Sequence, residues 1–125
     1  MNHYCWACYA VNERPSGVCV ACGEEIAAPR GTDYADLLLW GLGHPLPDRQ
    51  LLAAEILGRL HDRRAIEPLR RLVSESSDPY LAAQALRSLL AIDGATPHRP
   101  LLEQLAHSGA APVRAVAAAA LGELR

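Results

Sequence analysis

The sequence has no lysine, no phenylalanine and few aromatic residues of any kind. Its twelve basic residues are all arginine, and the formal net charge of the 125-residue chain is -2. A weakly acidic chain is not expected to coat nucleic acid through bulk charge. Because alanine and leucine dominate, the composition favours helices over a β-sandwich. Half of the residues are hydrophobic, which predicts one globular domain, or one domain with a small appendage.

Long hydrophobic runs and targeting signals are also missing. Apolar stretches such as Val116–Gly122 are far too short to span a bilayer. The first ten residues lack the basic start and the apolar segment of a signal peptide, and no terminal lipidation signal is visible. We therefore expect a cytoplasmic protein with no membrane partner, in which thiols stay reduced.

Cysteine is confined to the first 22 residues, where it forms two Cys-x-x-Cys pairs, Cys5 with Cys8 and Cys19 with Cys22. Each pair can place two thiolates on one tight turn, and two such turns complete a tetrahedral site with Zn–S distances of about 2.3 Å. Four thiolates leave no open coordination position, so we expect one Zn²⁺ with a structural role.

The same cysteines have other interpretations, which are two disulfides, a redox dithiol and an iron site. A reducing compartment argues against disulfides. A thioredoxin-like dithiol would need a neighbouring βαβ pattern, which the sequence lacks. His3 could in principle replace one ligand, but a solvated imidazole is the simpler interpretation beside a complete cysteine set.

The stretch CWACYAVNERPSGVCVACGEEI resembles short bacterial zinc ribbons. The resemblance rests on the four cysteines, on Gly23 directly after the second pair and on Ile26 in the hydrophobic position that follows. The sequence departs from the family at Trp6 and Tyr9, where proline and glycine are usual. The resemblance implies a small β-hairpin zinc ribbon over residues 1–26.

The spacer between the two pairs has room for a strand, a turn and a short return strand. We place the turn at residues 14–17, where the sequence reads Arg-Pro-Ser-Gly. Residues 1–28 are therefore predicted to form the ribbon, and residues 29–32 to form a linker.

From about Asp33 onward the sequence repeats with a period of 32 residues. The step superimposes Ala53, Ala85 and Ala117, and likewise Leu57, Leu89 and Leu121. It also places Pro68 on Pro100, Leu69 on Leu101 and Leu37 on Leu69. Each period holds two segments with apolar residues at helical spacing. The six predicted helices are 33–42, 47–60, 64–74, 79–92, 97–107 and 112–124.

Capping residues agree with these boundaries. Asp33 is a candidate N-cap, and Asp78 followed by Pro79 is an N-cap before a proline at the first helical position. Pro112 has the same N-terminal role, and Asp93-Gly94 is typical of a helix end.

The helical segments resemble HEAT-like repeats of the short bacterial, PBS-lyase type over residues 33–125. The closest copy reads Pro112-Val113-Arg114-x-x-Ala117-Ala118-x-Ala120-Leu121-Gly122-x-Leu124, and Ala65-Ile66-x-Pro68-Leu69 matches the signature of the other helix. The middle copy departs at Ser88 and Leu90. The fold class implied is mainly α, a HEAT-like solenoid of about six helices in three hairpins behind the small β-hairpin zinc ribbon.

Enzymatic motifs are missing from the sequence. There is no glycine-rich phosphate loop, no Gly-x-Ser-x-Gly elbow and no His-Glu-x-x-His. His61-Asp62 is interpreted as an inter-helix turn rather than a catalytic dyad. Some relatives of these repeats belong to bilin lyases, but this chain is short for a ligand-sized cleft and its cysteines are assigned to metal. We expect no enzymatic activity.

An arginine cluster is the first candidate partner surface, and it contains Arg63, Arg64, Arg70 and Arg71. Arginine forks suit carboxylates and phosphates, and HEAT geometry would aim some of them along a concave face. The alternative is an ordinary solvated helix surface, on which nearby glutamates such as Glu55 pair with these arginines.

Two further candidate surfaces are aromatic and aliphatic. Trp6 and Tyr9 lie beside the first cysteine pair, where they could stack on bases, contact a partner or pack on the helices. Val113, Val116 and Leu124 on the last helix are expected to be partly exposed and to dock on a second copy or another protein.

The leading functional hypothesis is a non-enzymatic adaptor that contacts another protein and carries a structural zinc site. The alternative is a factor associated with nucleic acid, the ribosome or RNA polymerase, which would use the ribbon and the arginine cluster. Nucleic-acid binding would weaken steeply with salt, whereas an apolar protein contact would not.

Overall fold

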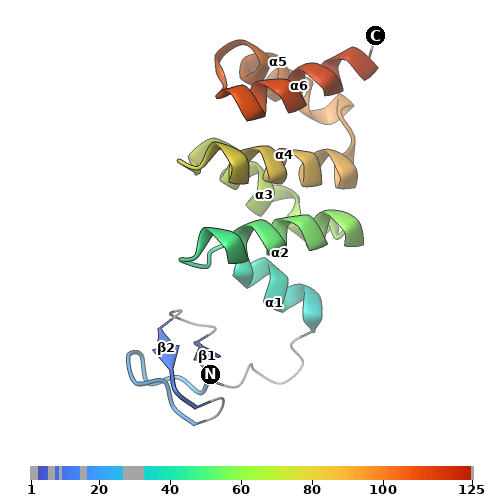
Figure 1. Cartoon of the computed structure of the whole chain (residues 1–125). Coiled ribbons are helices and arrows are strands. Elements are labelled where there is room, and N and C mark those ends of the chain that lie inside the picture. The colour runs from blue at the N-terminus through green and yellow to red at the C-terminus, as the bar shows by residue number, and fades with distance from the viewer. Residues whose placement is uncertain (1–2, 6–7, 9, 15–16, 27–32, 125) are drawn as a thin grey trace.

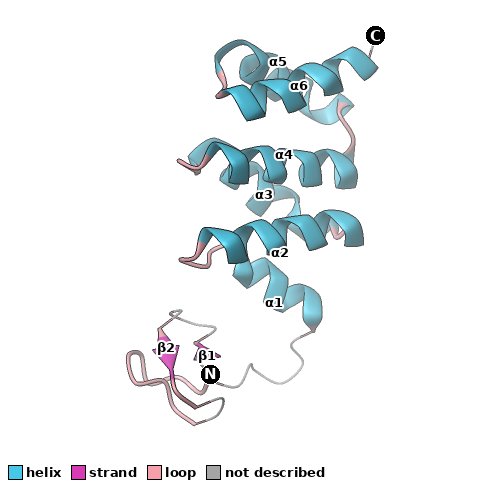
Figure 2. Ribbon diagram, viewed as in Figure 1, coloured by secondary structure: helices cyan, strands magenta, loops and turns pink. Residues whose placement is uncertain are grey.

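The computed structural model describes residues 3–5, 8, 10–14, 17–26 and 33–124. A small head that bears the cysteines is followed by helices stacked toward the C-terminus (Figure 1). Within the described residues the strands are confined to the head (Figure 2). The predicted linker, 29–32, lies outside the described residues, so the boundaries of the two parts remain predictions.

In the head, the residues that flank each Cys-x-x-Cys pair are paired with each other in antiparallel fashion. Strands β1 (His3–Tyr4) and β2 (Val11–Asn12) are antiparallel around the first cysteine pair. Val18 forms an isolated bridge with Glu25 around the second. The turn predicted at residues 14–17 includes residues 15–16, which lie outside the described residues. Among the described residues, each arm of the spacer pairs across its own cysteine pair.

Backbone hydrogen bonds close both turns in the same way. The amide of Cys5 donates to the carbonyl of Ala10 at 2.9 Å, and the amide of Cys19 donates to that of Glu24 at 2.8 Å. Gly23, at the end of the second turn, has φ of +81°, a conformation that side chains with a Cβ rarely adopt. The two cysteine pairs are thus closed by equivalent backbone hydrogen bonds.

The rest of the chain forms six α-helices, and all six were predicted within a few residues. They are α1 (Tyr34–Gly41), α2 (Pro47–Leu60), α3 (Ile66–Glu75), α4 (Pro79–Asp93), α5 (Arg99–Ser108) and α6 (Ala111–Glu123). Short 3-10 turns, η1 (Arg63–Ala65) and η2 (Thr96–His98), lead into α3 and α5. No helix among the described residues has both the length and the apolar content needed to cross a membrane.

The predicted caps are confirmed. Asp33 accepts a hydrogen bond from the amide of Asp36 at 2.8 Å, and the Asp36 carboxylate accepts one from the amide of Asp33, which makes a reciprocal capping box. Asp78 accepts from the first amides of α4. Gly94 ends α4 with φ of +76°.

The helices pack as three hairpins, α1 with α2, α3 with α4 and α5 with α6. Successive hairpins contact each other mainly through α2, α4 and α6, which lie one above the next in Figure 1. The buried alanines of the repeat, Ala53, Ala85 and Ala117, lie on these three helices. Their small size lets neighbouring helices approach closely. The largest fully buried side chains of the stack are Leu57, Leu69, Leu86, Leu89 and Leu102.

The register of the other helices departs from a constant period of 32. Leu69 is fully buried, but its structural equivalent is the fully buried Leu102 rather than the half-buried Leu101. In α1 the buried residue is Leu38, while Leu37 is 49% exposed. Because α4 is one residue longer than α2 and the loop before α6 is one residue shorter than the loop before α4, the offset between α3 and α5 is 33 residues rather than 32. The match of Leu69 with Leu101 is therefore wrong by one residue, and the match of Leu37 with Leu69 pairs an exposed side chain with a buried one.

Helices α2 and α4 make a close contact where Gly58 faces Ser88. A Cβ built on Gly58 would lie 2.7 Å from the Ser88 hydroxyl oxygen. That buried hydroxyl donates to the carbonyl of Ala54 at 2.7 Å, so it is held in place. Gly122 occupies the matching position of α6, and a Cβ there would meet nothing within 4 Å. The same position of the repeat is therefore in tight contact with a neighbouring helix on α2 and has open space beside it on α6.

Candidate functional site

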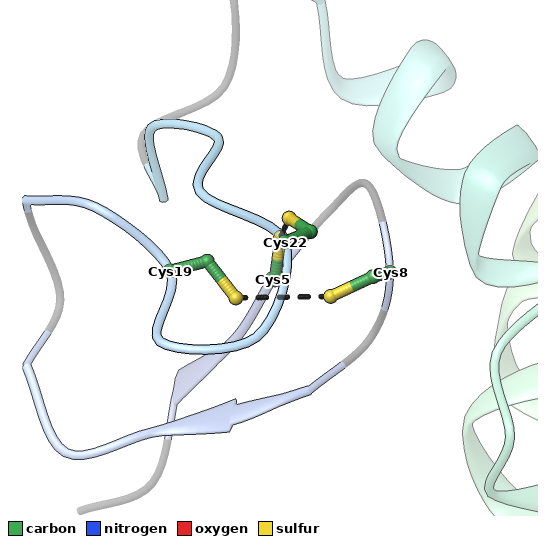
Figure 3. A group of neighbouring side chains, drawn as sticks. All are labelled: Cys5, Cys8, Cys19 and Cys22. Carbon is green, nitrogen blue, oxygen red and sulfur yellow. Dashed lines mark hydrogen bonds between the residues drawn. The ribbon is translucent and has the colours of Figure 1, made fainter.

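The four cysteine side chains converge between the two turns of the head (Figure 3). Their Sγ atoms all lie within 4.8 Å of one another. The closest pairs cross from one turn to the other, with 3.6 Å between the sulfurs of Cys5 and Cys22 and 3.7 Å between those of Cys8 and Cys19. All four cysteines are free thiols. Cys5 and Cys19 are buried, and Cys8 and Cys22 face solvent.

This arrangement fits a metal ion. A tetrahedron with metal–sulfur distances of about 2.3 Å has sulfur–sulfur edges of about 3.8 Å, close to the two cross-turn distances. A disulfide would need sulfurs about 2.05 Å apart. The four thiols could therefore hold one metal ion, and a set of four sulfurs suits zinc or iron.

A buried amide, that of Asn12, supports the cysteine cluster. Its side-chain NH₂ lies 3.5 Å from the sulfur of Cys19 and also donates to the carbonyl of Ala10 at 3.2 Å. Its carbonyl oxygen accepts from the amide of Val20 at 3.0 Å. Asn12 thus joins the turn that carries the first cysteine pair to the turn that carries the second. Nothing in the pattern of the spacer marks Asn12 as a buried polar side chain, so its role was not predicted.

Hydrogen bonds to Cys19 favour its charged form. The backbone amides of Cys22 and Ala21 and the Asn12 amide donate to this sulfur, and together they lower the pKa of the Cys19 thiol to about 6. The thiolate is the form that binds a metal ion. The local hydrogen bonds therefore favour the metal-binding form of the Cys19 sulfur.

We expect Asn12→Ala to weaken metal binding about 10- to 100-fold, the usual cost of removing a group that orients a ligand. The substitution removes a donor to the Cys19 sulfur and the bridge between the turns. Competition with a chromophoric zinc chelator would measure the change. Val20→Ala is the control, because this side chain is 85% exposed and the backbone amide that contacts Asn12 is kept. Equal zinc affinity for both variants would contradict the role given to Asn12.

Comparison with known proteins decides the family of the helical part. A family profile described as HEAT repeats matches residues 35–122, from α1 to the end of α6. The chain belongs to the HEAT-repeat family. HEAT repeats generally mediate protein interactions and are generally not enzymes. No curated protein and no solved structure gives a significant match to the chain.

Two of the four arginines in the predicted cluster form ion pairs within the HEAT hairpins. Arg64 forms ion pairs with Asp62 at 2.8 Å and with Asp36 at 2.9 Å. Arg63 pairs with Asp93 at 3.0 Å. The partners of Arg63 and Arg64 are aspartates at helix ends. Glu55, which was expected to pair with an arginine of this region, pairs with Arg59.

The other two members of the cluster differ from this pair. Arg70 and Arg71 are exposed on α3 and have no ion pair with any described residue. Only these two members of the cluster are therefore free to meet a partner's anion without breaking a contact of the fold.

The His61-Asp62 dipeptide has a structural role, in which an ion pair with Arg64 takes part. His61 ends α2 in a left-handed conformation with φ of 53°. Asp62 accepts from the amide of Arg64 at 3.0 Å and so caps η1. The Arg64 side chain donates hydrogen bonds to Asp62, and these contacts lower the pKa of that carboxyl. The dipeptide thus forms the turn between α2 and α3, as predicted.

A buried histidine forms a second polar contact between hairpins. His98, in η2, is 3% exposed, and its Nε2 lies 2.8 Å from a carboxylate oxygen of Asp93 at the end of α4. The hydrogen bond with His98 is the main reason for the lowered pKa of the Asp93 carboxyl. Arg63 contacts the other oxygen of that carboxylate. These three residues connect η1, α4 and η2, and no sequence pattern predicted them as a group.

The predicted apolar surface of α6 needs correction. Val113 is only 4% exposed and Ala120 only 7%, because α6 packs on both α4 and α5. Val113 therefore cannot present its side chain to a partner. Val116 and Leu124 are half-buried, and the exposed positions of α6 include alanines such as Ala115 and Ala119. Trp6 and Tyr9, the other predicted contacts, lie outside the described residues.

Proposed function

We propose that this chain is a non-enzymatic adaptor that binds another protein through its HEAT hairpins and carries one structural Zn²⁺ in its head. The observation that supports it best is the match of the stacked hairpins to HEAT repeats over residues 35–122. Their mutual packing through α2, α4 and α6 makes an extended surface that does not depend on a partner for its core.

Zinc is the metal we propose because the donor set contains four sulfurs and no oxygen or nitrogen ligand. Cys5, Cys8, Cys19 and Cys22 are the proposed ligands. With four thiolates bound, the ion has no position for a substrate. Its proposed role is to stabilise a head too small to fold around an apolar core.

The alternative, a factor that binds nucleic acid, has less support. Two of the four clustered arginines are engaged in ion pairs within the hairpins, and the free ones, Arg70 and Arg71, share α3 with the exposed acids Glu67 and Glu75. Phosphate contacts would require a surface with excess positive charge.

Affinity capture with the tagged full-length chain from the native cell tests the proposal. The lysate is treated with nuclease, and capture is compared at about 0.1 M and about 0.5 M salt. We expect a protein to be retained at both concentrations and to bind the purified chain directly. Recovery of RNA or DNA that is lost at the higher concentration would contradict the proposal and support the alternative.

A further inference from the structure

A cavity of about 620 Å³ lies between the first two hairpins, on the side formed by α1 and α3. This volume is within the range of about 300–1,000 Å³ typical of ligand sites. Arg64 ties the beginning of α1 to η1, just before α3, through its ion pair with Asp36. The cavity lies farther along, beside Leu39 and Leu42 at the end of α1 and Leu72 on α3.

The floor of this cavity is apolar and firmly supported. Leu42 is buried, and Leu39, Pro68 and Leu72 are half-buried. Leu39 and Leu72 pack against the main hydrophobic core. An aliphatic side chain placed on this floor would therefore be removed from water without any rearrangement of the helices.

The rim of the cavity is polar, and part of it is fixed in position. The Gln50 side chain donates to the carbonyl of Leu42 at 2.8 Å, and the Ser76 hydroxyl accepts from the amide of Asp78 at 3.2 Å. Arg71 also lines the cavity, and its guanidinium makes no ion pair with the described residues. The rim thus offers an unused cation directly beside an apolar floor.

We infer that this cavity binds a short segment of a partner protein in which an aliphatic side chain is followed closely by a carboxylate. The side chain lies on Leu39 and Leu72, and the carboxylate meets the Arg71 guanidinium, whose fork matches its two oxygens. Glu75, also on the rim, repels any anion in proportion to its charge, so it disfavours a doubly charged phosphate more than a singly charged carboxylate. The inference rests on the proposed adaptor function and names the segment that it recognises.

Selection from a random hexapeptide library displayed on phage, with the full-length chain as bait, tests this inference. We expect the selected peptides to share an aliphatic residue with Asp or Glu one or two positions later. Synthetic copies should bind Arg71→Gln at least ten-fold more weakly than the unchanged chain, and changing their acid to an amide should remove this difference. Arg70→Gln is the matched control, because Arg70 is an exposed, unpaired neighbour that does not line the cavity.

Several outcomes would overturn the inference. They are the absence of any enriched peptide, selected peptides without an acid, and equal losses for Arg70→Gln and Arg71→Gln. These outcomes are separable from failure of the adaptor function. If the partner captured from the cell binds Arg71→Gln as tightly as the unchanged chain, this site is wrong while the adaptor function holds. If no protein binds the purified chain, the adaptor function itself fails.

Discussion

Cys19→Ser is expected to unfold the head and to leave most of the helical signal unchanged. Cys19 is buried and receives hydrogen bonds from Ala21 and Asn12, so its loss removes both a proposed metal ligand and the best-supported sulfur of the cluster. Binding of a structural zinc ion is worth of order 10 kcal/mol to a small domain, which has no comparable apolar core to replace it. We expect nuclear magnetic resonance spectra to lose the dispersed signals of the cysteine-bearing head, while far-ultraviolet circular dichroism changes little.

Elemental analysis supplies the matching measurement on the unchanged chain, with one zinc per chain as the expected result. Val20→Ala is the control, because it alters the same turn at a side chain that is 85% exposed and should keep both the metal and the fold. Iron in place of zinc would correct the identity of the ion. Loss of the helical signal together with the head would show one cooperative unit and would contradict the predicted division of the chain.

Gly58→Ala is expected to destabilise the helical stack by about 1–3 kcal/mol, the usual cost of overpacking a tight contact. The added Cβ would lie 2.8 Å from the Cβ of Ser88 and 3.0 Å from its Cα. The serine cannot easily move away, because its hydroxyl is bonded to the carbonyl of Ala54. Helices α2 and α4 must therefore separate. Urea denaturation would measure the loss, and the melting temperature should fall by roughly 4–8 °C for each kcal/mol.

Gly122→Ala is the matched control for this prediction, since it makes the same change at the equivalent position of α6. Nothing lies within 4 Å of the Cβ that it adds. Alanine has a higher helix propensity than glycine by up to about 1 kcal/mol, so this variant should be as stable as the unchanged chain or slightly more stable. Equal effects of the two substitutions would show that α2 and α4 do not make the close contact at Ser88.

The helices were predictable because local rules determine them. Asp33 and Asp78 are good N-caps, Gly94 permits a positive φ, and apolar residues recur at helical spacing between them. The cysteine cluster was predictable for a similar reason. Each Cys-x-x-Cys pair places two thiols on one turn, and the short spacer keeps the two pairs close together. The one-residue shift that pairs Leu69 with Leu102 was missed. The extra residue of α4 is compensated by a shorter loop before α6, so the overall period of the repeat does not change.

The amino-acid sequence by itself therefore determined the helices, their hairpin order and the cysteine cluster, because each depends on residues that are near neighbours in the chain. Only the tertiary structure decided which polar side chains are used inside the fold. Asn12, Ser88 and His98 are buried against partners from other turns or helices. Arg64 pairs with α1, and Arg71 remains unpaired beside the cavity. Such assignments depend on how separate turns and helices are placed relative to one another in space, and no local sequence pattern encodes that placement.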